Sequence, residues 1–81
     1  MTEAEIRALV IAELGNIAPE TDPSAIDPNA DLRETLDIDS LDFLNFVTAV
    51  HKKLGVAVPE SDYAKLFTIK GAVAYFAQKL R

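Results

Sequence analysis

Leu36-Asp37-Ile38-Asp39-Ser40-Leu41-Asp42 is the stretch around which the rest of this chain is arranged. It closes an acidic, proline-containing segment and opens a strongly apolar run that continues to Leu54. A side-chain oxygen of Asp39 or Ser40 can accept a free backbone N–H group, so either residue can cap a helix here. Ser40 is therefore expected at a helix N-terminus, where free N–H groups and the helix dipole favour a phosphate group. An N-cap serine with no further role is the alternative, because Asp-Ser-Leu alone is a weak signal.

Apolar residues recur at helical spacing on both sides of this stretch. They predict a first helix from about Glu3 to Gly15 and a second from about Ser40 to Leu54. A short third helix follows, through about Leu66, and Thr68 caps a fourth. No segment alternates at period two, so no strand is expected. We predict an all-α fold: a small four-helix bundle with three main helices, one short helix and a long loop after the first helix.

Side chains at the predicted helix ends support these boundaries. Thr2 and Glu5 have the spacing of a capping box. Gly15 and Asn16 are expected to end the first helix, and Ser61 or Asp62 to cap the third. Between the first two helices, prolines interrupt any long helix, and three apolar residues are expected to anchor the loop in the core: Ile26, Leu32 and Leu36.

Length and composition indicate one small globular domain over residues 1–81. The chain has 49% hydrophobic and 26% charged residues and no cysteine, which excludes disulfides and Cys-based zinc or redox sites. No secretory signal and no membrane-spanning run is found, so a cytoplasmic protein is expected. We also expect a monomer.

Charge is distributed unevenly along the chain. The net charge of −5 argues against a nucleic-acid partner. Residues 20–42 carry eight carboxylates against Arg33 alone, a net −7, whereas residues 43–81 carry a net +4. The negative region around Ser40 is either a solvated loop or a surface that attracts basic partners.

Catalytic and metal-binding patterns are absent from the sequence. His51, the single histidine, follows Ser40 by eleven residues on the same helix, about 16 Å along its axis, so it cannot activate that hydroxyl. It is expected on the helix surface. Asp37 cannot begin a calcium loop, because Asp42 stands where glycine is needed and Thr48 where the last glutamate is needed. We therefore expect neither an enzyme nor a dedicated metal site.

The second predicted helix has two distinct apolar faces. Phe43, Phe46, Val47, Val50 and Leu54 fall on one sector, which is the expected core face. Leu41, Leu44 and Thr48 fall on another flank, beside Ser40. Partly exposed leucines there would form a small docking patch.

These features, in this order and spacing, resemble the acyl carrier protein family over nearly the whole chain. The resemblance includes a capped first helix, a long acidic loop, Leu36-x-x-Asp39-Ser40-Leu41-Asp42, Val58-Pro59-Glu60 and Thr68-Ile69. It implies that Ser40 carries a 4′-phosphopantetheine arm, which a phosphopantetheinyl transferase attaches from coenzyme A. The arm's thiol would hold an acyl group as a thioester for acyl-loading and acyl-transferring enzymes.

The resemblance also implies roles for residues near Ser40. Partner enzymes would dock beside the serine, on Asp39, Leu41, Asp42, Leu44 and Thr48. The acyl chain would enter the bundle, where the expected lining is Phe43, Phe46, Val47, Ile69 and Phe76. Aromatic bulk at Phe43 and Phe46 would narrow this pocket and favour short or polar acyl groups.

Two departures from the family pattern concern partner choice. Family members typically have glycine where Asp37 stands, and fatty-acid carriers have an acidic end to the second helix, where this chain reads His51-Lys52-Lys53. We therefore predict a specialised carrier with its own cognate enzyme rather than the general fatty-acid synthase carrier. An aminoacyl or D-alanyl-type carrier and a non-covalent helical interaction module are the alternatives.

Overall fold

A computed structural model describes residues 1–80 of the chain. Its long helices are α1 (Glu3–Ile17), α3 (Ser40–Leu54) and α4 (Ile69–Lys79). The shorter elements are the 3-10 helices η1 (Pro23–Ala25) and η2 (Glu60–Leu66) and the single-turn helix α2 (Leu32–Thr35). Residues 1–80 contain no strand, so the predicted small all-α bundle is confirmed.

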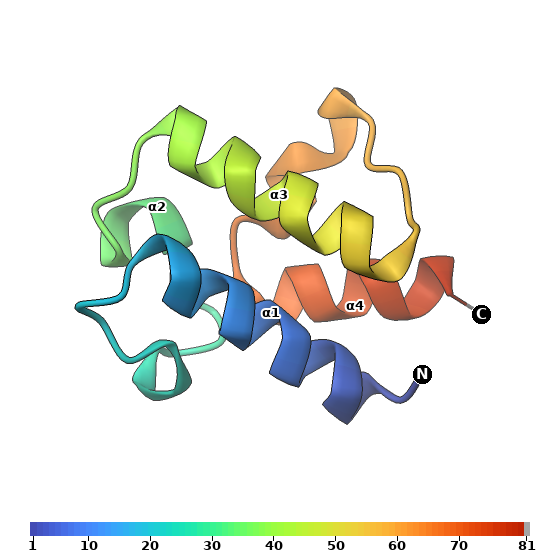
Figure 1. Ribbon diagram of the computed structural model, residues 1–81, viewed down its shortest axis with the longest axis horizontal. Coiled ribbons are helices and arrows are strands. Elements are labelled where there is room, and N and C mark those ends of the chain that lie inside the picture. Colours follow the sequence, from blue (N-terminus) through green and yellow to red (C-terminus); the bar gives the residue numbers. More distant parts are fainter. Residues whose placement is uncertain (81) are drawn as a thin grey trace.

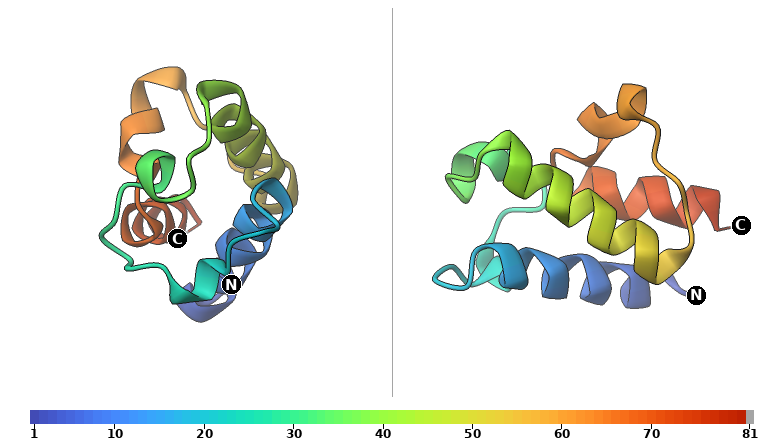
Figure 2. Two further views of the ribbon diagram at one scale, coloured as in Figure 1. Left: turned by 90° about the vertical axis from the view of Figure 1, so that its left-hand side faces the viewer. Right: turned by 45° about the horizontal axis from the view of Figure 1, so that its top comes forward.

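The three long helices enclose one apolar core. α1 contacts both α3 and α4, and η2 packs on α4 (Figure 1). Figure 2 shows that the loop carrying η1 and α2 closes one end of the bundle, whereas the start of α1 and the end of α4 lie near the other end. The largest fully buried side chains come from every long helix, from α2 and from η2: Phe46, Phe76, Ile6, Leu14, Leu32, Leu66, Ile69, Val10 and Val50. None of the helices in residues 1–80 has the length and apolar character needed to cross a membrane.

The start of α1 is as predicted, but its end is not. Thr2 and Glu5 form a capping box, with Thr2 Oγ1 accepting from the Glu5 N–H at 3.1 Å. The helix does not stop at Gly15 or Asn16 and instead runs to Ile17. Buried Ala18 caps it, since the next residue is a proline, which disfavours helical backbone at the residue before it.

Two backbone hydrogen bonds fasten the long loop to the opposite side of the bundle. The N–H of Leu32 donates to the carbonyl oxygen of Phe67 at 2.8 Å, and the N–H of Lys70 donates to that of Pro28 at 2.9 Å. Ile26 and Leu36 are buried with Leu32, as predicted for the loop anchors. The loop is thus held against the junction between η2 and α4.

A buried carboxylate links α1 to α3. Glu13 lies in the core with only 6% of its surface exposed. Its Oε1 is 3.5 Å from Nζ of Lys53, whose ammonium group supplies the opposite charge that a buried carboxylate requires. Lys53 is therefore paired with Glu13 and is not a free positive charge on α3.

The prediction that Ser61 or Asp62 caps the third helix is wrong. η2 begins at Glu60, after Pro59, and no side chain caps it. Asp62 Oδ2 instead accepts a hydrogen bond from the hydroxyl of Tyr75 at 2.8 Å. This bond joins η2 to α4. Asp62 thus bonds a residue thirteen positions later in the chain and does not cap its own helix.

Tyr75→Phe is expected to lower the unfolding midpoint by a few degrees at pH 7, and by less in acid or above pH 10. The hydrogen bond from Tyr75 lowers the pKa of Asp62, and burial raises the pKa of Tyr75. Stabilisation from Asp62 is present above its unfolded pKa of about 3.9 and disappears as pH falls through the lower folded value. That from Tyr75 is present below about pH 10 and disappears as the phenol ionises. Thermal melts across pH test this, with Tyr63→Phe as the control expected to show no such dependence.

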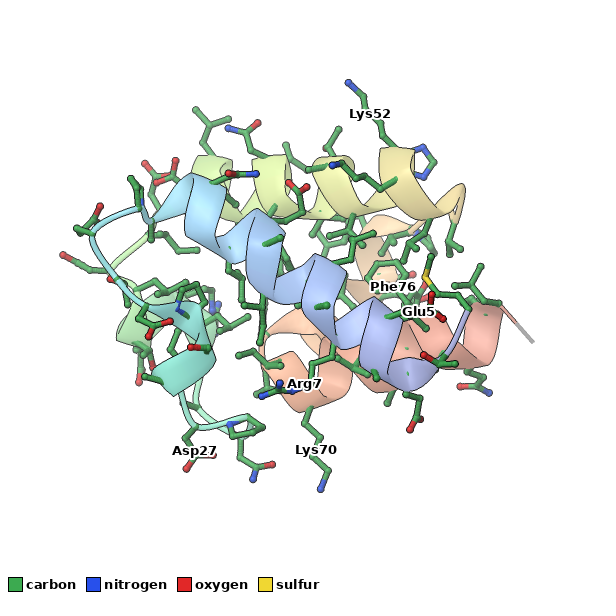
Figure 3. All side chains as sticks on the ribbon, turned by 60° about the horizontal axis from the view of Figure 1, so that its bottom comes forward. Glu5, Arg7, Asp27, Lys52, Lys70 and Phe76 are labelled. Atoms are coloured by element: carbon green, nitrogen blue, oxygen red, sulfur yellow. The ribbon has the colours of Figure 1, made fainter. Side chains whose placement is uncertain are left out.

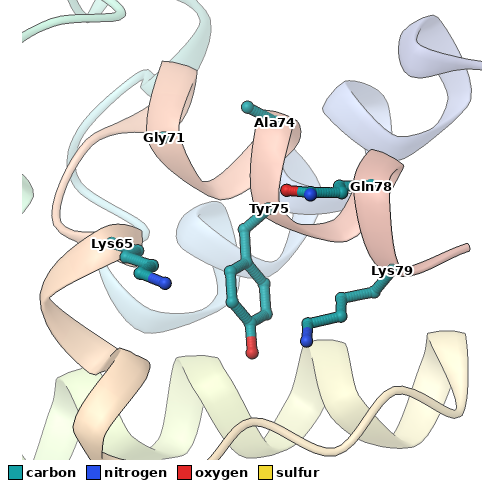
Figure 4. A pocket seen from close by; sticks show the side chains of 6 residues that line it. All are labelled: Lys65, Gly71, Ala74, Tyr75, Gln78 and Lys79. Atoms are coloured by element: carbon teal, nitrogen blue, oxygen red, sulfur yellow. The ribbon is translucent and has the colours of Figure 1, made fainter.

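Gly71→Ala is expected to destabilise the fold by about 1–3 kcal/mol, although alanine normally favours a helix. A Cβ atom at this position would overlap the backbone carbonyl oxygen of Lys65 and lie 2.9 Å from Thr68 Oγ1. Figure 4 labels both residues, Lys65 near the end of η2 and Gly71 in the first turn of α4.

Gly15→Ala is the matched control for this clash. Its added Cβ would meet only the Pro23 ring, at an ordinary 3.8 Å, so we expect a gain of about 0.5–1 kcal/mol. Urea unfolding measures both variants, and equal effects at the two glycines would contradict the tight contact at Gly71.

Candidate functional site

Ser40 is the first residue of α3 and is exposed at its N-terminus. Asp39 makes the cap that the sequence allowed for either residue, because Asp39 Oδ1 accepts from the N–H of Asp42 at 2.9 Å. The Ser40 hydroxyl takes no part in this cap. The first N–H groups of a helix have no intrahelical acceptor, so those of Ser40 and Leu41 point to the space beside the hydroxyl. This arrangement fits a phosphodiester attached at Ser40 Oγ.

The backbone before Ser40 makes a sharp turn at Asp37. Asp37 adopts a left-handed conformation with φ of +51°, the only residue other than glycine to do so within residues 1–80. Glycine is the residue best suited to this conformation, and aspartate is among the few others that tolerate it. Aspartate at position 37 is thus compatible with the turn found here. Buried Leu36 precedes the turn and fixes the segment to the core.

A cavity of about 410 Å³ opens beside Ser40. Its walls come from α2, the first half of α3, η2 and the residue after η2: Arg33, Ser40, Leu41, Phe43, Leu44, Glu60, Tyr63 and Phe67. Most of the lining is apolar side chain, so an apolar group attached near Ser40 can lie in it without leaving the neighbourhood of the serine.

Of the five residues expected to line an acyl pocket, only Phe43 borders this cavity. The other four lie deeper, each at most 3% exposed, in the packed core: Phe46, Val47, Ile69 and Phe76. Phe76 points inward between the helices in Figure 3. The acyl pocket inside the bundle stays a prediction. Sequence reasoning missed Tyr63 and Phe67, whose aromatic character and four-residue spacing before the last helix were the available signal.

The outward flank of α3 carries the residues predicted to dock partners. Leu41 is 64% exposed and Leu44 is 40% exposed, as the helical spacing predicted. Asp39 and Thr48 are also exposed, and Asp42 is partly so. Their docking role stays a prediction, and they form one continuous surface that begins at Ser40.

Arg33 is the one cation lining the cavity. Its guanidinium donates to Asp31 Oδ2 at 2.9 Å and to Asp31 Oδ1 at 3.3 Å. These hydrogen bonds hold the pKa of Asp31 below its usual range, so the carboxylate stays charged to a lower pH than an unpaired aspartate would. The Arg33 guanidinium also stacks on the Phe67 ring, 3.7 Å from its centroid.

His51 lies at the other end of α3, far from Ser40. Its Nδ1 is 2.8 Å from the carbonyl oxygen of Val56, and the ring is partly buried rather than fully on the surface as expected. Among residues 1–80, no group of three or more His, Cys, Asp or Glu side chains is placed to hold a metal ion.

Comparison with known proteins agrees with this geometry. The family model described as "Phosphopantetheine attachment site" matches residues 4–76. An acyl carrier protein of Rhodococcus erythropolis is 40% identical over 74 residues, which cover 88% of this chain and 80% of that protein. The chain belongs to the acyl carrier protein family. It carries acyl groups as thioesters on a covalent 4′-phosphopantetheine arm and works with phosphopantetheinyl transferases and acyl-handling enzymes.

Other acyl carrier proteins match over similar lengths. That of Campylobacter hominis is 35% identical over 71 residues, covering 88% of this chain and 84% of its own. The meromycolate extension acyl carrier protein of Mycobacterium tuberculosis is 39% identical over 80 residues, covering 99% of this chain and 68% of that protein. The relatives of this acyl carrier protein thus include a carrier named for one specialised pathway.

Proposed function

We propose that Ser40 is the attachment point of the arm and that the chain is a specialised carrier without catalytic activity of its own. The observation that carries the assignment is the exposed Ser40 hydroxyl beside unpaired N–H groups at the start of a fifteen-residue helix. The other serines are placed differently. Ser24 donates to Asp22 Oδ1 at 2.6 Å, and Ser61 lies within η2.

Ser40 has no base that could make it a nucleophile unaided. His51 is held near the far end of α3 by Val56, and the carboxylate nearest in sequence, Asp39, is occupied as the helix cap. The chain's own contribution is to present the hydroxyl, to stabilise the attached phosphate at the helix N-terminus and to offer a docking surface. Partner enzymes supply the acid–base chemistry for attaching the arm and for transferring the acyl group.

The charges along α3 support a cognate partner different from that of a general fatty-acid carrier. Of the three basic residues at its C-terminal end, His51 bonds Val56 and Lys53 lies beside Glu13. Lys52 makes no ion pair with residues 1–80, and it projects away from the bundle in Figure 3. A partner that binds this surface therefore contacts acidic groups near Ser40 and the free Lys52 ammonium group at the C-terminal end of α3.

Lys52→Glu is expected to raise the rate of loading by a general fatty-acid synthase enzyme two- to tenfold at low salt, because peripheral charges act mainly on association rates. The gain should shrink as salt screens the charge. Lys53 is left unchanged, since a glutamate there would repel buried Glu13.

Lys70→Glu, on the exposed surface of α4, is the matched control, because it makes the same charge change away from α3. It should leave loading unchanged. Equal rates for wild type and Lys52→Glu across salt concentrations would contradict a specialised docking surface.

Attachment itself is tested by incubating the protein with a broad-specificity phosphopantetheinyl transferase, coenzyme A and Mg²⁺. Intact mass spectrometry is expected to show the gain of one arm, and fragmentation is expected to place it on Ser40. A mass that does not change would overturn the assignment and favour a non-covalent interaction module. An arm on Ser24 or Ser61 would overturn the choice of residue.

A further inference from the structure

A second cavity, of about 770 Å³, lies between η2 and the outer face of α4 (Figure 4). Its lining residues are Lys65, Gly71, Ala74, Tyr75, Gln78 and Lys79. It shares no lining residue with the cavity beside Ser40. We call it the basic groove, because its lining within residues 1–80 contains two lysines and no carboxylate.

The two lysines reach the groove from different elements. Lys65 belongs to η2 and Lys79 to the last turn of α4, and in Figure 4 their side chains extend toward Tyr75 from opposite sides. Gly71, which approaches the backbone of Lys65, precedes Lys79 by eight residues, or about 12 Å along a helix axis. The groove therefore has one positive charge near each end.

Both positive charges remain available to a ligand. Lys65 Nζ is 3.5 Å from Asp62 Oδ1, but its side chain is 66% exposed, so its ammonium group keeps free N–H donors. The other oxygen of Asp62 accepts from the Tyr75 hydroxyl. Lys79 Nζ lies 5.5 Å from the centroid of the Tyr75 ring and makes no ion pair with residues 1–80. Asp62 and Tyr75 thus position the two lysines and leave Lys79 unneutralised.

Small and polar groups form the floor between the lysines. Gly71 has no side chain and exposed Ala74 has only a methyl group, so the backbone of another chain can approach α4 closely. The exposed amide of Gln78 can donate to and accept from a peptide group. Within residues 1–80, the exposed large apolar side chains all lie outside the groove: Met1, Leu41, Leu44 and Leu80. The groove therefore suits a polar, extended segment, whereas an amphipathic helix or a bilayer needs an apolar face.

We propose that the basic groove binds an extended acidic segment of a partner protein, with carboxylates four residues apart contacting Lys65 and Lys79. Four extended residues span about 13 Å, which matches the length of the groove along α4. A single phosphate or carboxylate ion is too short to contact both ends at once. The proposal goes beyond arm attachment at Ser40 and does not depend on it.

The distribution of charge in the chain favours such a partner. Residues 43–81 carry a net +4 in a chain whose net charge is −5. An acidic segment is therefore attracted to the basic groove and repelled by the acidic surface around Ser40. The carrier can hold this partner on α4 and η2 while the first turn of α3 stays free for an enzyme.

Nuclear magnetic resonance titration of the full chain tests the groove directly. The probe is a glycine-rich peptide with blocked ends and two glutamates four residues apart. We expect amide shifts at Lys65, Ala74 and Lys79 and none at Ser40, with an affinity that falls as salt rises. The same peptide with lysines in place of the glutamates should cause no shifts in the groove.

Substitutions separate the groove from general attraction to a basic surface. Lys65→Gln and Lys79→Gln are each expected to weaken binding about threefold or more at low salt, as the loss of one exposed ion pair allows. Ala74→Leu fills the floor without changing charge and should weaken binding to a similar extent.

Two variants are the matched controls. Lys70→Gln removes another exposed lysine of α4, one that does not line the groove, and Ala8→Leu adds the same bulk to the exposed face of α1. Both should bind the peptide within about twofold of wild type, as exposed positions away from a contact usually do.

Each contrary result overturns a stated part of the proposal. No shift in the groove at millimolar peptide overturns the site itself. Equal weakening by Lys70→Gln and by the two groove lysine variants overturns the contacts assigned to Lys65 and Lys79. Groove shifts caused by vesicles of anionic phospholipid, or by self-association of the chain, but not by the peptide overturn the choice of occupant. A protein that binds the peptide but gains no arm overturns the assignment of Ser40 and leaves the groove standing.

Discussion

Ser40→Ala is expected to abolish attachment of the arm completely. The phosphodiester forms at the serine oxygen, and alanine has no atom that can replace it. The variant should keep its fold, because the Asp39 cap and the α3 hydrogen bonds do not use the Ser40 hydroxyl. We expect its unfolding free energy to stay within about 0.5 kcal/mol of wild type, as for most exposed positions. Intact mass after incubation with the transferase and coenzyme A is the measurement.

Ser61→Ala is the control for this experiment, since it removes an exposed hydroxyl from a different helix. It should accept the arm at the wild-type rate. A Ser40→Ala protein that still gains one arm would show that the modified residue lies elsewhere.

Phe46→Ala is expected to cause the largest loss of stability, about 3–5 kcal/mol, the usual cost of removing a buried aromatic ring. Phe46 is fully buried at the middle of α3 and packs against Phe43. Small domains unfold with only about 5–15 kcal/mol, so this loss takes a large share of the total. Urea unfolding followed by circular dichroism measures it, with a constant slope as the check that unfolding remains two-state.

Asn45→Ala is the matched control, because it changes the preceding, exposed residue of the same helix. Its effect should stay within about 0.5 kcal/mol. Phe46→Leu should cost less than Phe46→Ala, since more of the ring's volume is retained. A loss below about 1 kcal/mol for Phe46→Ala would mean that the core can close over the missing ring, contrary to its tight packing.

Local sequence signals predicted the positions of the three long helices. Helical spacing and caps predicted the start of α1 at Glu3, both ends of α3 and the Thr68 cap of α4. These features depend on residues within one or two turns of each other, which is why one sequence is enough to read them. The same spacing separated the core face of α3 from the exposed flank that holds Leu41 and Leu44.

Local signals were less successful where a distant partner decides the outcome. Asp62 looked like a helix cap, but it bonds Tyr75. Gly15 looked like a helix end, but α1 continues until packing of Ala18 and the following proline end it.

The candidate site also has one part that local sequence predicts and another that depends on tertiary contacts. Ser40, its position at the tip of α3 and the acidic surroundings follow from the residues next to it in the chain, because caps and helix dipoles are local. The cavity beside Ser40 depends on the loop, which brings Arg33 onto Phe67, thirty-four residues later, and is held there by the hydrogen bond from the Leu32 N–H to the Phe67 carbonyl oxygen. No periodic pattern encodes such a contact, since it exists only once α2, α3 and η2 pack against one another.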